Sequence, residues 1–204
     1  MAPGEPVSQR RIGLTGGIAS GKSSVGRWLA QQGLPVFDAD QYAREALEPG
    51  RPATNSVQQR YGSTVQSEGG AAIDRAALGR IVFQDPAERQ WLEQLIHPIV
   101  RERFDRALSL HAQTPAVVLM IPLLFEAGLE SLCSEIWLVD CDESQQLERL
   151  IARDGLSPEA AQARITAQWP LSRKRVLADQ IICNQGPPGA WQPLAMDLLS
   201  DGGI

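Results

Sequence analysis

The sequence predicts an α/β protein built on a doubly wound parallel sheet of five strands. Short apolar runs alternate along the chain with segments of helical periodicity. Residues 41–113 contain no convincing strand, and residues 144–170 form a shorter helical stretch of the same kind. Because strands separated by helices favour right-handed βαβ units, this order predicts a parallel sheet with one large helical insertion and one small one.

Five apolar runs are the expected strands. They cover residues 11–15, 34–40, 116–125, 135–142 and 180–184. The run at 116–125 is the longest, which is typical of a strand buried on both faces of a sheet. The first run leads into a glycine-rich loop, and the helix expected after that loop has Val25, Trp28 and Leu29 on one face. Gly33 is the expected end of this helix.

The large insertion contains strong helix signals. Asp85 is a good N-cap, with Pro86 at the first helical position and Glu88 completing a capping-box pattern. The apolar stripe of this helix consists of Trp91, Leu92, Leu95 and Ile96. Pro98 is expected to end it and to start a further helix. Insertions of this kind on α/β sheets often form the acceptor side of a site.

The smaller insertion is predicted to be two helices. The first begins at Ser144 and has Arg149 and Arg153 one turn apart. The second begins after Ser157, an N-cap residue followed by Pro158. The final residues begin as a loop and include one weak helix.

Composition excludes several classes of protein. A formal net charge of -5 argues against a protein that coats nucleic acid. No apolar run reaches the roughly 18 residues of a membrane span. The first residues, MAPGEPVSQRR, lack the apolar core of a signal peptide. We therefore expect a short leader before the first strand and a cytoplasmic protein.

The glycine-rich loop fits the P-loop pattern, with Gly16, Gly21, Lys22 and Ser23 at the required spacing. Glycines let successive backbone N–H groups turn toward phosphate oxygens, and the following helix N-terminus adds partial positive charge. Lys22 is expected to reach the β- and γ-phosphates, and the Ser23 hydroxyl to ligate Mg²⁺. The motif therefore predicts nucleoside triphosphate binding.

The rest of the chain indicates which kind of nucleotide-binding protein this is. No Asn-Lys-x-Asp guanine-recognition motif occurs, which argues against a GTPase. Asp140 ends the fourth apolar run, where it is either an acidic residue of the nucleotide site or a strand-end cap. A small chain with a helical insertion and an arginine-bearing second insertion favours a kinase of small molecules, since such enzymes close over the phosphates to exclude water.

Asp38 and Asp40 are candidates for acceptor chemistry. In an extended chain they point to the same side, at the carboxyl end of a strand where α/β sheets bind ligands. Asp40 is the candidate base for an acceptor hydroxyl, and Asp38 a structural or Mg²⁺-supporting carboxylate. The alternative is that one of them caps the following helix.

Two further candidates have competing interpretations. Arg149 and Arg153 share a helix face and could neutralise charge on a transferring phosphoryl group. The alternative is a solvated basic edge paired with Glu148 or Asp154. His97 either ends a helix or contacts a ligand.

Taken together, the motifs resemble the dephospho-coenzyme A kinase family. The matching stretches are IGLTGGIASGKSSV, FDADQYAREALEPG, FQDPAERQWLEQLIHPIV, IPLLFEAGLE and RKRVLADQIICNQG. They occur in the family's order over residues 12–186. Two departures are small: Ala19 replaces a frequent glycine, which we expect to be tolerated with a negative φ, and Ser24 replaces a common threonine.

The resemblance implies a three-layer P-loop core (residues 11–40, 114–143 and 171–204), a helical dephospho-CoA-binding domain (41–113) and a lid (144–170). It implies transfer of the γ-phosphoryl of ATP, with Mg²⁺, to the ribose 3′-hydroxyl of dephospho-coenzyme A. The alternatives are another small-molecule P-loop kinase and a non-catalytic nucleotide-binding protein. No nucleic-acid or membrane partner is expected, and the chain is expected to be a monomer or small homo-oligomer.

Site residues follow from the same resemblance. Asp40 matches the catalytic carboxylate, alongside Lys22 and the lid positions Arg149 and Arg153. Asp38 and His97 join Asp40 as expected substrate-binding residues. Residues expected to bind the nucleotide are Thr15, Gly16, Gly17, Ile18, Ala19, Ser20, Gly21, Lys22, Ser23, Ser24 and, near the adenine, Asn184.

Overall fold

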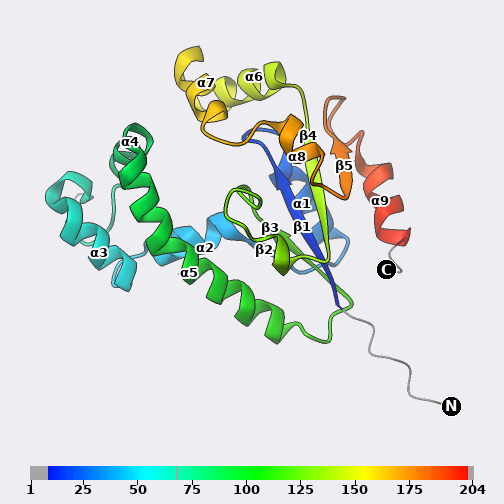
Figure 1. Ribbon diagram of the computed structural model, residues 1–204, viewed down its shortest axis with the longest axis horizontal. Helices are drawn as coiled ribbons and strands as arrows, with labels where there is room; N and C mark the ends of the chain where they lie inside the picture. The colour runs from blue at the N-terminus through cyan, green and yellow to red at the C-terminus, as the bar shows by residue number, and fades with distance from the viewer. Residues whose placement is uncertain (1–8, 68, 202–204) are drawn as a thin grey trace. The chain divides into compact units, whose positions relative to one another are not determined.

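The computed structural model describes residues 9–67 and 69–201, and its centre is a parallel five-stranded sheet (Figure 1). The strands lie in the order β2-β3-β1-β4-β5. Their bounds are β1 Arg10–Gly16, β2 Val36–Asp38, β3 Ala116–Met120, β4 Glu135–Asp140 and β5 Gln180–Cys183. The predicted fold class is confirmed. Most of the expected leader lies outside the described residues.

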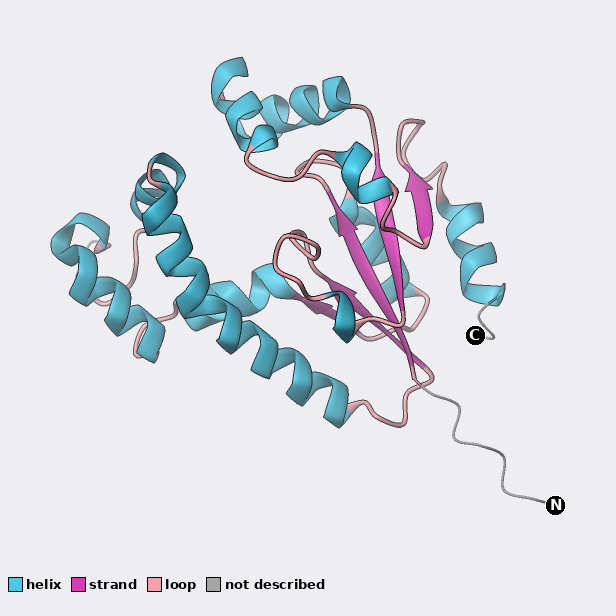
Figure 2. Ribbon diagram, in the orientation of Figure 1, coloured by secondary structure: helices cyan, strands magenta, loops and turns pink. Residues whose placement is uncertain are grey.

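Helices connect and flank the strands (Figure 2). The chain divides into two compact units. The core unit contains the described residues up to Asp38 and from His111 onward, and the helical unit is Ala39–Leu110. Helices of the core unit are α1 Lys22–Gln31, η2 Glu130–Leu132, α6 Glu143–Asp154, α7 Pro158–Thr166, α8 Leu171–Arg175 and α9 Gln192–Asp201. Those of the helical unit are α2 Ala39–Ala46, α3 Pro52–Tyr61, η1 Gly62–Val65, α4 Arg75–Gln84 and α5 Pro86–Leu110.

Strand β1 occupies the centre of the sheet. It pairs in parallel with β3 on one side and with β4 on the other. Its carboxyl end therefore lies in the middle of the edge where open α/β sheets bind ligands, and the connections from β1 and β3 run to opposite sides of the sheet at this point. The loop after β1 is consequently the best-placed segment for a ligand.

Both faces of the sheet are covered within the core unit. Helices α1 and α9 pack on one face, where Val25, Leu29 and Leu199 join the buried strand residues Leu14 and Trp137. On the other face α8 packs against β4, and the segment after β3 approaches β1 closely. The sheet is thus the middle layer, and the apolar runs are strands because both of their faces are removed from water.

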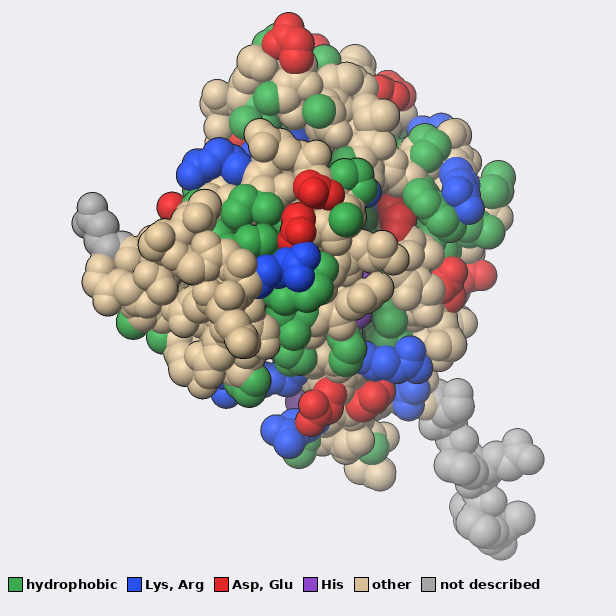
Figure 3. Space-filling model, turned by 60° about the vertical axis from the view of Figure 1, so that its left-hand side comes forward, with side chains coloured by type: hydrophobic (Ala, Val, Ile, Leu, Met, Phe, Trp, Pro, Cys, Tyr) green, Lys and Arg blue, Asp and Glu red, His purple; other side chains and the backbone are tan. Residues whose placement is uncertain are grey.

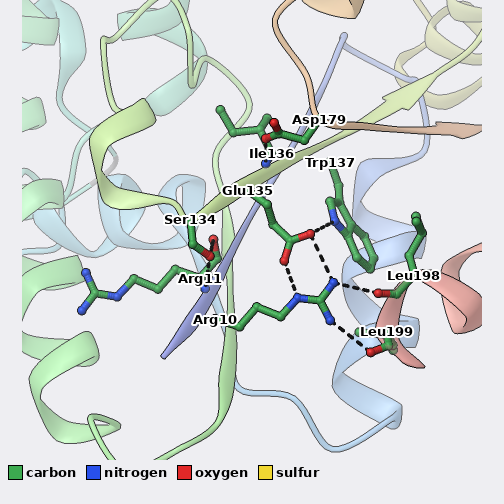
Figure 4. A network of polar contacts seen from close by, with 9 residues as sticks. All are labelled: Arg10, Arg11, Ser134, Glu135, Ile136, Trp137, Asp179, Leu198 and Leu199. Carbon is green, nitrogen blue, oxygen red and sulfur yellow. Dashed lines mark hydrogen bonds and ion pairs between the residues drawn. The ribbon is translucent and has the colours of Figure 1, made fainter. Parts of the chain in front are cut away.

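Arg10 connects the first strand to the last helix (Figure 4). Its guanidinium pairs with Glu135 and donates to the carbonyls of Leu198 at 2.7 Å and Leu199 at 3.1 Å. Glu135 also accepts from the Trp137 indole N–H at 2.8 Å. A cation at the C-terminal end of a helix satisfies carbonyls that have no intrahelical donor. This contact docks α9 on the sheet.

Three predicted strands were too long by two residues or more. The strand expected at 34–40 is only β2, and Ala39 already belongs to α2, so Asp40 lies in the first turn of a helix. The expectation that Asp38 and Asp40 extend to the same side was therefore wrong. A carboxylate in the first helical turn is favoured by the helix dipole. The strand expected at 116–125 ends at Met120, close to Pro122, which has no N–H for the ladder. The strand expected at 135–142 ends at Asp140.

The break predicted at Pro98 was also wrong. Helix α5 is continuous from Pro86 to Leu110 with Pro98 inside it. Proline removes the hydrogen bond to the carbonyl of Gln94, but both residues are exposed, so water can satisfy that carbonyl.

Two predicted helix starts are confirmed, and a third helix begins one residue earlier than predicted. The Asp85 carboxylate accepts from Ala87 N–H at 2.8 Å, and Ser157 Oγ accepts from Ala160 N–H at 3.2 Å. Helix α6 begins at Glu143 rather than Ser144, with Asp142 in the N-cap position.

None of the helices in the described part of the chain has both the length and the apolar character needed to cross a membrane. On the face drawn in Figure 3, Lys and Arg side chains occur in small groups beside Asp and Glu groups rather than as one basic surface.

Candidate nucleotide and acceptor site

The loop between β1 and α1 has the turns of a phosphate-binding loop. Ser20 N–H donates to Gly17 O at 3.1 Å, and Gly21 has a φ of +99° immediately before α1. An added Cβ at Gly21 would collide with the Asn184 amide, and one at Gly17 would collide with the Gln146 amide. Only glycine therefore combines this backbone conformation with such close neighbours. The N-terminus of α1 follows this loop directly, and a helix N-terminus favours anions through its dipole, while Ser24 N–H donates back to Gly21 O at 2.9 Å.

Ala19 has a φ of +59°, so the expectation of a negative φ was wrong. It is the one residue other than glycine with a positive φ among the described residues. The left-handed region costs a residue with a Cβ about 1–2 kcal/mol. Surrounding contacts must hold this conformation.

The loop residues differ in exposure. Lys22 is the first residue of α1 and is 9% exposed. Ser23 and Ser24 lie in the same first turn and are exposed, which leaves the Ser23 hydroxyl accessible to a ligand. Thr15, at the end of β1, is buried and donates through Oγ1 to Pro122 O at 3.2 Å. The Thr15 hydroxyl therefore makes a hydrogen bond within the protein interior.

Asn184 and Arg149 meet beside the loop. Asn184, which follows β5, donates its amide Nδ2 to Ser20 O at 2.8 Å. Arg149 on α6 donates Nη2 to Asn184 O at 2.9 Å, while its buried Nη1 has no hydrogen-bond partner. The structure thus brings two predicted residues, distant in the sequence, together with the loop.

A cavity of about 570 Å³ opens at this point. Several of its wall groups are flat or rigid, as a planar ligand requires: the Arg149 guanidinium, Pro188 and the indoles of Trp28 and Trp191. The two indoles pack edge to face with ring centroids 5.6 Å apart. The complete lining is Gly21, Ser24, Arg27, Trp28, Gln31, Arg149, Asn184, Gly186, Pro188, Gly189, Trp191 and Gln192.

Arg153 is not brought to the loop. Its guanidinium bonds both carboxylate oxygens of Asp154, at 2.7 Å and 3.0 Å, and its side chain is 58% exposed. The hydrogen bond from Arg153 is the main reason that the pKa of Asp154 is lowered. In this conformation Arg153 pairs with Asp154, as the alternative interpretation expected.

Sequence reasoning missed a group of residues that fix the loop from outside. Gln146 on α6 donates Nε2 to Ile18 O at 2.7 Å, and Ile18 N–H donates to Gln168 Oε1 at 2.9 Å. Both glutamines and Gly17 line a second cavity, of about 510 Å³. No local pattern in the sequence singles out these glutamines.

The PLLFE stretch has a structural role that spacing did not reveal. Pro122 O accepts from Thr15 and also from Lys174 Nζ at 3.2 Å. Lys174 is fully buried and pairs with Glu126 Oε1 at 2.8 Å. The same oxygen accepts from Trp169 N–H at 3.0 Å. This stretch therefore anchors both the phosphate-binding loop and the segment after α7.

Asp140 uses only one of its two carboxylate oxygens within the described residues. Its Oδ2 pairs with Arg175 Nε at 2.9 Å, and its buried Oδ1 has no partner. Among the residues that the structure describes, no group of three or more His, Cys, Asp or Glu side chains could hold a metal ion.

The helical unit has its own cavity, of about 300 Å³. Asp40 lies on its wall with Arg44 and Arg75, and Arg75 donates to Arg44 O at 3.3 Å. The remaining wall is mostly apolar: Ala43, Leu47, Leu78, Gly79, Val82 and Leu92. His97 is exposed on α5 and is not among these lining residues. Asp38 is half-buried at the end of β2, in the core unit.

Comparison with known proteins decides the family. A family model described as dephospho-CoA kinase matches residues 10–188. This chain belongs to the dephospho-CoA kinase family. It is therefore a kinase, a transferase of phosphoryl groups, and the predicted resemblance is confirmed.

Two dephospho-CoA kinases are similar to this chain over most of its length. That of Synechococcus sp. (strain CC9605) is 85% identical over 199 residues, covering 98% of this chain and 96% of the relative. That of Parasynechococcus marenigrum (strain WH8102) is 63% identical, covering 87% of this chain and 89% of the relative.

Solved structures agree with this family. A protein of Thermus thermophilus is 36% identical with a TM-score of 0.81, covering 95% of this chain and 98% of its own. The dephospho-CoA kinase from Campylobacter jejuni is 27% identical with a TM-score of 0.69, covering 94% and 96%. A shikimate kinase from Acinetobacter baumannii, 17% identical with a TM-score of 0.54 and covering 97% of each chain, shares the fold alone.

Proposed function

We propose that this enzyme transfers the γ-phosphoryl of ATP to the ribose 3′-hydroxyl of dephospho-CoA, giving CoA and ADP. The observation that carries the proposal is an intact phosphate-binding loop, with Lys22 at the start of α1, in a chain 85% identical to a dephospho-CoA kinase over nearly its whole length. Lys22 and the helix N-terminus supply the positive charge that a transferring phosphoryl group needs.

We place the adenine of ATP in the cavity beside Asn184. Arg149 and Pro188 both line this cavity and offer surfaces on which a planar base stacks. The unpartnered Nη1 of Arg149 supports a ligand there, because a buried guanidinium nitrogen gains from a new acceptor. Asn184 holds the loop through Ser20 at the same time.

Mg²⁺ is proposed to accompany ATP. Ser23, exposed in the first turn of α1, would hold the ion together with phosphate oxygens and water, which is how Mg²⁺ is often bound at phosphate sites. The ion would neutralise phosphate charge. Asp38 is proposed to support it or the substrate, at the carboxyl end of β2.

Residues 41–113, which overlap most of the helical unit, are proposed to bind the acceptor substrate dephospho-CoA. Asp40 is proposed to accept the proton of the ribose hydroxyl, and its place on the wall of a cavity supports this role. His97 is proposed to contact dephospho-CoA. Residues 144–170 are proposed to act as a lid, in which Arg153 leaves Asp154 to neutralise phosphoryl charge when the lid closes.

The decisive experiment measures phosphoryl transfer from ATP to several acceptor substrates. Purified protein with ATP and Mg²⁺ is given dephospho-CoA, shikimate, gluconate or a nucleoside, and both ADP and the phosphorylated product are measured. We expect ADP release only with dephospho-CoA and one phosphoryl group added at the 3′ position. Equal turnover of another acceptor would overturn the proposal in favour of a different small-molecule kinase.

We further propose a cytoplasmic location and a monomer or small homo-oligomer. Three cysteines without a disulfide, Cys133, Cys141 and Cys183, are compatible with a reducing compartment. Size-exclusion chromatography with light scattering would give the oligomeric state.

A further inference from the structure

The peptide groups on both sides of Ile18 are held by the two ends of the segment proposed as the lid. Gln146, on the first lid helix α6, donates Nε2 to Ile18 O at 2.7 Å. Gln168, just after the second lid helix α7, accepts from Ile18 N–H at 2.9 Å. One glutamine acts as a donor and the other as an acceptor, so together they satisfy both backbone groups of one loop residue.

Holding these two groups fixes the strained part of the loop. Ile18 O belongs to the peptide that leads into Ala19, whose φ is +59°. A left-handed alanine persists only where surrounding contacts determine it. The Gln146 amide orients that peptide from a side chain only 4% exposed, so water does not compete for the bond. The geometry therefore depends on α6 being in place.

Gln168 is itself anchored. The next residue, Trp169, donates its N–H to Glu126 Oε1 at 3.0 Å, and Glu126 pairs with the buried Lys174. The acceptor therefore projects from a segment fixed to Glu126, whereas the donor projects from helix α6.

We propose that Gln146 and Gln168 are positioning residues that set the phosphate-binding loop in its nucleotide-binding conformation and couple that conformation to the lid. This rests on the proposed binding of ATP at the loop. Neither residue needs to touch the nucleotide. Gln146 acts by orienting the Ile18–Ala19 peptide, and Gln168 by orienting the Gly17–Ile18 peptide.

Because Gln146 donates and Gln168 accepts, substitution by glutamate should have different effects at the two positions, and this difference gives a sharp test. In Gln146→Glu an ionised carboxylate faces the Ile18 carbonyl and cannot donate, while the protonated form can. In Gln168→Glu the carboxylate still accepts from Ile18 N–H at any pH. Both variants add the same charge near the same loop, so each controls for the electrostatic effect of the other on ATP.

The readouts are the equilibrium Kd for ATP by calorimetry and the steady-state KM for ATP and kcat, from pH 6 to 9. At pH 8.5 we expect Gln146→Glu to bind ATP about tenfold more weakly than Gln168→Glu, the effect of one unsatisfied buried group. The gap should narrow toward pH 6, because burial and the facing Ile18 carbonyl raise the pKa of the new carboxyl at position 146. The titratable and charged groups lining the second cavity, Cys141, Asp142, Glu143 and Arg175, are present in both variants and cancel in the ratio.

Parallel pH profiles, or an equal Kd for ATP in the two variants, would overturn the proposal. If Gln146→Glu fails to fold, the Kd for ATP is compared between Gln168→Met and Gln162→Met instead. Gln162 lines the same cavity but bonds Glu143 at the start of α6, so its loss should leave the Kd for ATP unchanged while Gln168→Met raises it several-fold. An equal Kd for ATP in these two variants would overturn the positioning role of Gln168. A wild type that binds ATP but forms no CoA would contradict the proposed function and leave this test intact.

Discussion

The buried pair Lys174–Glu126 should be among the most sensitive sites in the core unit. The Lys174 side chain is 0% exposed and the Glu126 side chain 16% exposed, with 2.8 Å between Nζ and Oε1. Glu126→Leu leaves the ammonium group with Pro122 O as its described acceptor. An uncompensated buried charge costs about 3–5 kcal/mol. Against a domain stability of about 5–15 kcal/mol, this loss would be severe.

The partner substitution should cost less. Lys174→Met removes the buried ammonium charge and leaves Glu126, whose side chain is 16% exposed, still bonded to Trp169 N–H, so we expect a loss of about 1–3 kcal/mol. The double variant should be less destabilised than the sum of the two single variants by at least about 1 kcal/mol, because the stranded lysine charge is then absent.

Urea unfolding followed by tryptophan fluorescence measures these free energies, and an unchanged m-value shows that the comparison is valid. Additive single and double variants would refute the reasoning, and so would a loss below about 1 kcal/mol for Glu126→Leu.

The remaining predictions concern separate parts of the molecule. Asp40→Asn should keep ATP affinity and lower kcat at least about a hundredfold; calorimetry and ADP release test this, and unchanged turnover would remove Asp40 from its role. Ala19→Gly should raise the free energy of unfolding by up to about 1 kcal/mol, because relief of the left-handed strain exceeds the added chain entropy; thermal unfolding showing a loss would contradict it. Arg10→Met should speed hydrogen exchange in α9, whose last carbonyls it binds, while α6 is unaffected. Hydrogen bonds from Arg60 and then Tyr61 lower the pKa of Glu88 to about 2, so its stabilising contribution, full above its ordinary pKa of 4.5, is lost as pH falls toward 2; Arg60→Gln should flatten the pH dependence of stability between pH 5 and 2.

Sequence alone predicted the parts of the site that are encoded locally. The loop motif needs glycines at fixed spacing between a strand and a helix, and all of this information lies within about fifteen residues of Arg10. The boundary at Asp38 was harder, because an acidic residue suits both a strand end and the first turn of a helix. The continuous helix through Pro98 depended on solvent exposure, which the sequence does not record.

Residues that act across long separations were out of reach. Gln146 and Gln168 meet Ile18 from 128 and 150 positions away. A glutamine on a helix carries no signature of a partner at such a distance. The positive φ of Ala19 was missed for the same reason, because the contacts that hold it come from other elements.

The docking of α9 by Arg10 has a consequence for synthesis of the chain. In the pairing of β1 with β3, Arg10 lies opposite Ala116. The Arg10 side chain also donates to Leu198 O of α9. At translation rates of about 5–20 residues per second, β1 waits roughly 5–20 s for its first sheet partner. The helical unit, Ala39–Leu110, leaves the ribosome as one continuous piece during that interval. Asn184 and Trp191, which line the cavity beside the phosphate-binding loop, are therefore synthesised long after the loop itself.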